Sequence, residues 1–352
     1  MQHVDLEQFV VIDETASLTA KTHGGRAKCL QRLIRLNMPV PLTVALPIAT
    51  VRAISTGMQV DAAKILAHFG SAPLVSVRPS SEDPDWGGPG TFLNIGMNDA
   101  RHAEYANLLG HAAADEMYSR FVQTYSVEVA HLDPDSFEIP PDGGADTLRA
   151  MLDAYEAETD EPFPQDPARQ LADVLKSMAR AWEGTTARLL RQARGAPADA
   201  GLGLVVQRMA PGLGPPESGS GVIQFVSSVT GLPQITGRYL RQSQGREALR
   251  DESAVYLTCD PRGPSLEELY PEGFDKLVEF GAVCRARLKE EMQIEFSIDG
   301  GELSVLDAVR IQRSARAAMR IAVALAEDGV ITRDEAVLRI PPGGLSELMH
   351  RQ

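Results

Sequence analysis

The sequence predicts an α+β protein, because strand patterns and helical patterns occur in separate blocks of the chain. Residues 292–309, MQIEFSIDGGELSVLDAV, alternate apolar and polar side chains on both sides of an Asp-Gly-Gly turn, a pattern typical of a β-hairpin. Residues 102–194 instead carry alanine, leucine and charged residues at helical spacing. The length of 352 residues is too great for one compact core, so two or three subdomains are expected.

Composition and charge exclude several classes of protein. Hydrophobic residues make up 43% of the chain and charged residues 23%, as in ordinary soluble proteins. The net charge of −14 argues against a nucleic-acid-binding surface. No apolar run approaches the roughly 18 residues of a membrane span, and the N-terminal segment lacks the features of a signal peptide, so no membrane partner is expected. Three widely spaced cysteines form no zinc motif and predict a cytoplasmic protein.

The hairpin carries two acids that could hold a metal ion. Glu295 and Asp307 lie 12 residues apart and are expected on facing strands, near the end of the hairpin away from the turn. Two carboxylates on rigid strands suit a Mg²⁺ ion that bridges nucleotide phosphates, because Mg²⁺ keeps several waters and takes few protein ligands. The alternative is a solvated hairpin face with ordinary surface acids.

Two basic residues near the N-terminus follow signals for anion binding. Gly24 and Gly25 precede a helical pattern, and Arg26 follows them in its first turn, where free N–H groups attract anions. Residues 73–78 form a strand pattern that delivers Arg78 to the start of a polar, glycine-rich loop. A plain turn at the glycines, and a pairing of Arg78 with nearby acids, are the alternatives.

A glycine- and serine-rich loop, residues 212–221, joins the strand patterns at 203–209 and 222–226. Such a loop can fold over a triphosphate and offer backbone N–H groups to it. It lacks the Gly-Lys-Ser/Thr of a Walker A sequence and could equally be a flexible hairpin tip. Helices are predicted for 266–291, for 314–327, and from Thr332, which would form a capping box with Glu335.

Several motifs, taken in order, resemble one known family. They are the glycine pair followed by a basic helix and Pro-Val-Pro, Leu-Val-Ser-Val-Arg ending at 78, Leu-Asn-Ile-Gly-Met-Asn-Asp at 93–99, and Gln-Ile-Glu-Phe-Ser at 293–297. In this order they resemble the N-terminal ATP-binding domain of pyruvate phosphate dikinase, to which domains of phosphoenolpyruvate synthases and rifampin phosphotransferases are related. The resemblance implies an ATP-grasp fold, in which two α+β lobes clasp ATP. It implies a first lobe at 1–100, a helical insert at 101–198, a second lobe at 199–313 and C-terminal helices at 314–352.

The resemblance also implies roles for individual residues. Arg26 stands at the lysine of the family's Gly-Gly-Lys motif, and Arg78 at an arginine that contacts phosphates. Glu295 keeps the carboxylate of an Asp-Ile-Glu motif whose aspartate is Gln293 here, and Asp307 opens the segment that aligns with Gln-Thr-Arg, with Arg310 one place beyond it. The expected catalytic residues are Arg26, Arg78, Glu295 and Arg310. The expected nucleotide-binding residues are Arg26, Arg78, Gln207, Ser218, Gly219, Ser220, Gly221 and Glu295, and the expected metal ligands are Glu295 and Asp307.

Three positions depart from the family pattern. Val309 takes the place of the arginine in Gln-Thr-Arg, which removes a charge that would stabilise a phosphate in the transition state. Arg238 takes the place of a glutamate, and Glu82 that of an arginine. These changes indicate a rebuilt pocket.

The resemblance therefore predicts an ATP- and Mg²⁺-dependent phosphotransferase that passes a phosphoryl or pyrophosphoryl group to a separate acceptor, either a small molecule or a histidine carrier protein. Because the relatives continue into a domain with a phosphorylatable histidine, a separate histidine-domain protein is an expected partner. The alternatives are a catalytically silent ATP-binding regulatory module and an ATP-grasp ligase. The acceptor, the product nucleotide and the oligomeric state stay open.

Overall fold

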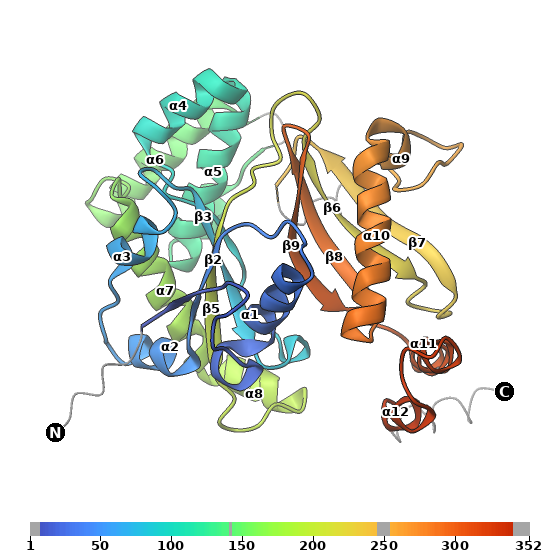
Figure 1. Cartoon of the computed structure of the whole chain (residues 1–352). Helices are drawn as coiled ribbons and strands as arrows, with labels where there is room; N and C mark the ends of the chain where they lie inside the picture. Colours follow the sequence, from blue (N-terminus) through green and yellow to red (C-terminus); the bar gives the residue numbers. More distant parts are fainter. Residues whose placement is uncertain (1–7, 141–142, 245–253, 341–352) are drawn as a thin grey trace. The chain divides into compact units, whose positions relative to one another are not determined.

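The structure is a computed structural model that describes residues 8–140, 143–244 and 254–340. It divides into two compact units, each with its own sheet (Figure 1). The first unit comprises Met1–Arg35 and Val40–Met209, and the second comprises Leu36–Pro39 and Ala210–Gln352. Helices together with two antiparallel sheets confirm the predicted α+β class.

The first unit contains a five-stranded antiparallel sheet of order β1-β2-β5-β3-β4. Its strands are β1 (Val10–Val11), β2 (Thr43–Leu46), β3 (Val75–Ser81), β4 (Phe92–Ile95) and β5 (Leu202–Arg208). Its helices are α1 (Ala20–Arg35), α2 (Ile48–Ser55), α3 (Ala62–Ala67), α4 (Asp99–Leu109), α5 (His111–Glu128), α6 (Ala145–Thr159), α7 (Pro167–Glu183) and α8 (Thr185–Ala193), with 3₁₀ turns η1 (Pro84–Trp86) and η2 (Pro134–Phe137).

Helix α1 packs against β3 and β5 through an unusually close approach at Gly24. The helix is kinked there, where φ is +85°. The Ser80 hydroxyl donates to the His23 carbonyl and accepts from the Ala27 N–H, at 2.8 and 3.1 Å. A side chain at position 24 would overlap the Ser80 carbonyl, so glycine is required for this contact. Gly24 itself is not helical, so it separates a short turn at the start of α1 from the longer helix that follows, in line with the helix start predicted at the glycine pair.

The second unit contains a four-stranded antiparallel sheet of order β7-β6-β8-β9. Its strands are β6 (Gly219–Val226), β7 (Pro233–Arg241), β8 (Met292–Asp299) and β9 (Glu302–Arg310). Its helices are α9 (Leu266–Leu269), α10 (Pro271–Leu288), α11 (Ala315–Glu327) and α12 (Arg333–Leu338). The hairpin of β8 and β9 and the Thr332–Glu335 capping box are confirmed.

One face of this sheet is apolar and lies under α10 (Figure 1). Ile294, Phe296 and Ile298 of β8 are fully buried, and Tyr239 of β7 stacks with Phe296 at a centroid distance of 6.1 Å. Gly221 lies between these two strands, and a side chain there would strike the Phe296 ring. The alternation of β8 therefore sends its apolar residues to α10 and its polar residues to the opposite face.

The structure differs from the sequence prediction at the glycine-rich loop. Gly219, Ser220 and Gly221 belong to β6, so the predicted loop 212–221 ends at Ser218. Within the helical block, Gly110, with φ of +94°, separates α4 from α5. Strand β5 pairs in the first sheet, and the helical block belongs to the first unit.

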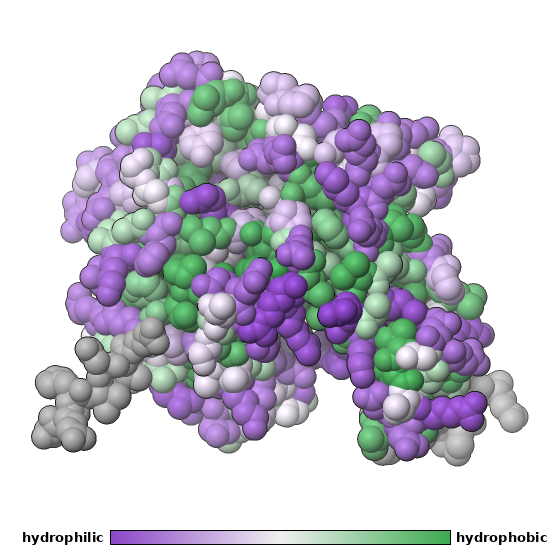
Figure 2. Space-filling view, in the orientation of Figure 1, coloured by the Kyte–Doolittle hydropathy of each residue, from purple (hydrophilic) through white to green (hydrophobic). Residues whose placement is uncertain are grey.

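Hydrophilic side chains cover most of the outer surface in the view of Figure 2, as expected from the charged fraction of the chain. Across the described ranges, no helix is both long and apolar enough to cross a membrane.

Candidate functional site

The predicted metal ligands lie directly opposite each other in the second unit. Glu295 of β8 pairs with Asp307 of β9, and paired residues of an antiparallel ladder project from the same face of the sheet. Both side chains are buried, at 7% and 3% exposure. We call the face that carries them the acid face; it is the face opposite the apolar residues that pack under α10.

A β-bulge brings the two acids together. Between the turn and Phe296 the strands pair in a register that would place Leu306 opposite Glu295. The register shifts after the Phe296–Val305 pair, so that β9 contributes one extra residue and Asp307 pairs with Glu295 instead. Without this bulge Asp307 would occupy the apolar face.

The acid face continues across the sheet in one row. Val222 pairs with Glu295, and Arg238 pairs with Val222, so the row runs Arg238, Val222, Glu295, Asp307. Strands are about 4.8 Å apart, which places the backbone of Arg238 about 10 Å from that of Glu295. The Arg238 guanidinium lies 4.7 Å from the centre of the Tyr256 ring. The acid face thus combines a carboxylate pair with one arginine in the same row.

Arg310 and Val309 lie on different faces. Arg310 pairs with Met292 and so projects from the side of Met292 and Ile294, whereas Val309 pairs with Gln293 beside the acids. Arg310, a predicted catalytic residue, is therefore placed away from the acid face by the strand register. The neighbouring position of β9 on the acid face carries Val309.

The loop residues predicted to contact phosphates form hydrogen bonds within the second unit. The amides of Gly219, Ser220 and Gly221 lie in a strand with neighbours on both sides. The Ser218 hydroxyl accepts from the Gly300 N–H at 2.8 Å, and the Ser220 hydroxyl bonds that of Ser243 at 2.8 Å.

The remaining predicted residues belong to the first unit. Arg78 and Gln207 are buried and project from the same face of the first sheet, because Arg78 pairs with Val205 and Gln207 pairs with Ser76. Gln207 donates to the Thr43 hydroxyl at 3.1 Å. Arg26 extends from α1 and donates to the Pro79 carbonyl. Helix α1 packs on the face of Arg78, through Ser80, so the structure gathers these three residues on one side of the sheet.

Sequence reasoning interpreted Asp299 only as a turn residue, but Asp299 also lies on the acid face, two alternations beyond Glu295. Burial raises the pKa of its carboxyl group, and the nearby backbone N–H groups of Gly212 and Leu213 oppose the rise. Counting every second residue from Glu295 would have placed Asp299 on this face.

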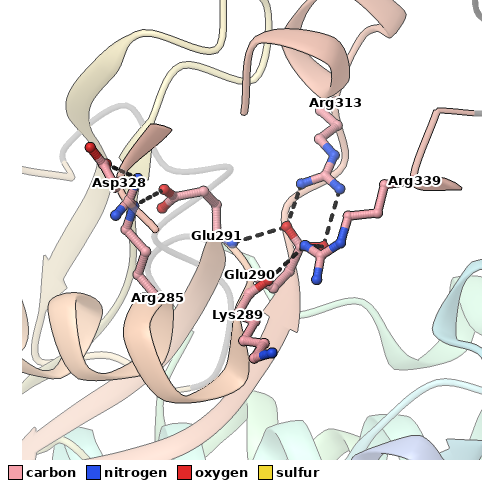
Figure 3. A network of polar contacts seen from close by, with 7 residues as sticks. All are labelled: Arg285, Lys289, Glu290, Glu291, Arg313, Asp328 and Arg339. Carbon is pink, nitrogen blue, oxygen red and sulfur yellow. Dashed lines mark hydrogen bonds and ion pairs between the residues drawn. The ribbon is translucent and has the colours of Figure 1, made fainter. Parts of the chain in front are cut away.

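A network of charged residues closes the end of the hairpin away from the turn (Figure 3). Arg313, just after β9, donates to both oxygens of Glu290, just before β8, at 2.6 and 3.2 Å. Arg285 of α10 joins Glu291 and Asp328, at 2.7 and 2.6 Å. Arg339, after α12, donates to the Lys289 carbonyl at 2.6 Å. The network therefore connects the C-terminal helices to the end of the hairpin that lies away from the turn.

In chemical terms, the acid face can bind a divalent cation through two carboxylates and leave its other coordination positions to water or phosphate oxygens. Among the described residues, no group of three or more histidine, cysteine or acidic side chains could enclose a metal ion. A two-carboxylate site fits Mg²⁺ held jointly with a nucleotide better than a metal caged by protein alone.

Comparison with known proteins finds several pyruvate, phosphate dikinases. The chain is 30% identical to a pyruvate, phosphate dikinase of Rhizobium meliloti over 93% of the chain and 41% of that protein. It is 31% identical to that of Clostridium symbiosum over 79% of the chain and 33% of that protein, and 26% identical to the chloroplastic protein of Zea mays.

The chain is a relative of the pyruvate, phosphate dikinases. It spans about two fifths or less of the length of these dikinases. No protein-family model matches the sequence.

Proposed function

We propose that this dikinase relative is an ATP-dependent phosphotransferase domain that binds ATP together with Mg²⁺ and passes a phosphoryl or pyrophosphoryl group to a separate acceptor. The facing pair Glu295 and Asp307 is the observation that carries the proposal. The relatedness to the dikinases supports the nucleotide as donor. An ATP-grasp fold, with phosphate contacts from Arg26, Arg78 and Gln207, belongs to the same proposal.

The acids would act through the metal. Two carboxylates hold Mg²⁺, which bridges phosphate oxygens and offsets the charge that develops on the transferred group. Little covalent chemistry is required of the protein, because phosphoryl transfer depends mainly on positioning and electrostatic stabilisation. The acceptor is either a small molecule or a histidine carried by another protein or domain.

The test is Mg²⁺-dependent ATP turnover in the presence of candidate acceptors, with Glu295→Gln and Asp307→Asn as variants. Each variant removes one charged metal ligand, so we expect turnover to fall by about 100-fold or more and the Mg²⁺ dependence to shift to higher concentration. Glu302→Gln is the matched control, since Glu302 is an exposed acid on the same hairpin. Equal turnover in the wild type and both acid variants would contradict the proposal that Glu295 and Asp307 bind the metal ion.

A second function, an ATP-binding module without transferase activity, is favoured by one observation. Val309 occupies the place beside the acids where an arginine would stabilise the transition state. Calorimetry with ATP and Mg²⁺ distinguishes the two. Binding without turnover for any acceptor supports the module, whereas turnover that depends on Glu295 supports the transferase.

A further inference from the structure

Arg238 is the one basic residue of the second sheet that shares a face with the two acids. Strands β6 to β9, all of them described, contain three basic residues, Arg238, Arg241 and Arg310. Arg241 lies three positions beyond Arg238 on β7 and so projects from the opposite face, as Arg310 does on β9. An anion that binds a metal ion held by Glu295 and Asp307 therefore has Arg238 as its basic neighbour within the sheet.

The row of the acid face extends past Arg238 to an aromatic ring. Val255 and Tyr239 exchange two backbone hydrogen bonds, at 2.7 and 3.2 Å, so the next residue, Tyr256, comes beside Arg238 on the outer side of β7. The N–H and carbonyl of Tyr256 also form backbone hydrogen bonds to the segment that follows, at 3.2 and 2.8 Å. The Tyr256 ring thus has a fixed place in the row, on the side of Arg238 away from the acids.

The Arg238 guanidinium lies near this ring, and no acid neutralises it among the described residues. It is 4.7 Å from the ring centre, a cation–π contact that orients the planar group. Within the part of the chain that the structure describes, the half-buried Arg238 side chain forms no ion pair and no hydrogen bond. Its N–H donors are therefore available to a ligand.

A second arginine near the same ring differs in having an acid partner. The Arg262 guanidinium is 4.8 Å from the ring centre of Tyr256, and it donates to both oxygens of Asp260 at 2.8 and 2.7 Å. The hydrogen bonds from Arg262 are the main cause that lowers the pKa of Asp260 to about 2, and the charge of Arg238 adds a smaller contribution. Asp260 thus neutralises Arg262. Among the described residues, this end of the row keeps the positive charge of Arg238 in excess.

The distance between Arg238 and the acid pair suits a chain of phosphates. Strand β6 lies between β7 and β8, so the backbones of Arg238 and Glu295 are about 10 Å apart. Val222, between them in the row, is apolar. A triphosphate carries charge along its length, so its metal-bound part can lie at the acids while another of its phosphates reaches the arginine. A guanidinium binds such a group through two parallel N–H···O bonds.

We propose that Arg238 is a phosphate-binding residue of the nucleotide site: it binds the part of the triphosphate that the metal on Glu295 and Asp307 does not hold, and the Tyr256 ring positions its guanidinium. The inference rests on the proposed function and deepens it. The second unit then holds the phosphate chain at two points, through a metal ion at the acid pair and through a guanidinium on the far side of β6.

The test is calorimetry of MgATP binding to the full chain and to the variants Arg238→Met and Arg238→Lys. We expect the Kd of MgATP to rise about 10- to 100-fold in Arg238→Met, because a charge-assisted contact with phosphate is lost. Arg238→Lys keeps the charge and loses the planar pair of donors, so its Kd should lie between those of the wild type and Arg238→Met.

Arg241→Met is the matched control. It removes one positive charge from the same strand, but from the opposite face, where Glu217 binds that arginine at 2.9 Å. Its Kd should stay close to that of the wild type. Equal Kd values in the wild type and Arg238→Met, or equal losses in Arg238→Met and Arg241→Met, would overturn the proposal.

Adenosine distinguishes a contact with phosphate from a contact with the base or the sugar. Because adenosine carries no phosphate, the wild type and Arg238→Met should have the same affinity for it. Weaker binding of adenosine by Arg238→Met would overturn the assignment of Arg238 to the phosphates.

Two variants test Tyr256 as a positioning residue. Tyr256→Phe keeps the ring and should bind MgATP as the wild type does, whereas Tyr256→Leu removes the ring and should raise Kd about fivefold. If the ring acts through Arg238, the double variant Arg238→Met with Tyr256→Leu should bind no more weakly than Arg238→Met alone. A further loss in the double variant, or an equal loss in Tyr256→Phe and Tyr256→Leu, would overturn this role.

Failure of this inference is distinguishable from failure of the proposed function. If the wild type binds no MgATP, both fall. If Glu295→Gln abolishes metal-dependent binding while Arg238→Met binds MgATP as the wild type does, the proposed function stands and only the role of Arg238 is lost.

Discussion

Glu295 and Asp307 face each other only because β9 contains one extra residue. The spacing of the two acids around the Asp-Gly-Gly turn predicted that they would face each other, and the register confirms it. A regular hairpin with this turn would have paired Glu295 with Leu306. No residue type in 305–307 signals a bulge, so the sequence predicted the outcome and not the cause.

Strand register and strand order also decide which other charged residues share the acid face. Arg310 is near the acids in sequence, but alternation along β9 sends it to the opposite face. Arg238 lies 57 positions from Glu295 in the chain and yet occupies the same row, because β6 lies between their strands. Long-range strand order, which a single sequence does not display, decides which charged residues share a face.

Cys284 offers a prediction about pH at the scale of one residue. It is fully buried in α10, and burial raises its pKa to about 12. In the unfolded chain the thiol titrates near pH 8.5, so between this pH and the folded-state pKa the folded protein keeps the proton that the unfolded chain loses. The stability that the buried neutral thiol contributes is fully present below the unfolded pKa. It is lost as the pH rises toward the folded pKa. Between pH 9 and 11 the wild type should lose about 1.4 kcal/mol of unfolding free energy per pH unit relative to Cys284→Ala.

Urea unfolding of both proteins at several pH values measures this difference. Cys284→Ala is the suitable reference because it removes only the sulfhydryl group from the buried position. If the unfolding free energies of the wild type and Cys284→Ala changed in parallel between pH 7 and 11, the thiol would have the same pKa in the folded and the unfolded protein.

At the scale of elements, the Gly-Gly pair marks the start of a helix, as the sequence predicted, and it also has a packing role that the sequence did not display. Gly24 is not helical and lies at the kink that precedes the longer part of α1. Its backbone touches the Ser80 carbonyl of β3. Tertiary contact with a strand more than 50 residues away decides this packing role, so local pattern alone could not predict it.

Replacement of Gly24 tests that contact. Gly24→Ala adds a side chain where φ is +85° and where the Ser80 carbonyl leaves no room, so we expect a loss of roughly 3–5 kcal/mol. Gly57→Ala is the matched control, because Gly57 has φ of +110° and no neighbour within 4 Å, and it should cost only about 1 kcal/mol. Chemical denaturation measures both. Similar losses for the two variants would mean that backbone conformation, and not the contact with β3, requires glycine at position 24.

At the scale of the whole molecule, the α+β class followed from the sequence, whereas the unit to which each segment belongs depends on long-range contacts. Residues 36–39 lie within the first unit's stretch of chain but belong to the second unit, where the Pro39 carbonyl accepts from the Val305 N–H at 2.9 Å. Strand β5 precedes the second unit directly and pairs in the first sheet. Hydrophobic pattern identifies strands but does not show which sheet each one joins.

The charged network of Figure 3 determines how the C-terminal helices remain attached to the second unit. Helix α11 also packs through an apolar cluster with β6, which includes Val226, Ile321 and Leu325. Glu290 and Arg313 are only 17% and 12% exposed, so removing one partner leaves a charge with reduced access to water. We expect Glu290→Gln to cost about 3 kcal/mol and Arg313→Met alone a similar amount.

The double variant should be less destabilised than the sum of the two single variants, because it removes both buried charges together. Arg149→Met with Asp146→Asn provides the control cycle, since that ion pair is fully exposed and should show a coupling below about 0.5 kcal/mol. Hydrogen exchange of α11 and α12 measured on the same proteins locates the effect. If Glu290→Gln speeds exchange in both helices as well as in β8 and β9, the C-terminal helices and the acid-bearing hairpin open as one unit. If it speeds exchange in the helices alone, the apolar contacts of β8 are sufficient to hold the hairpin, and the network serves only to anchor the end of the chain.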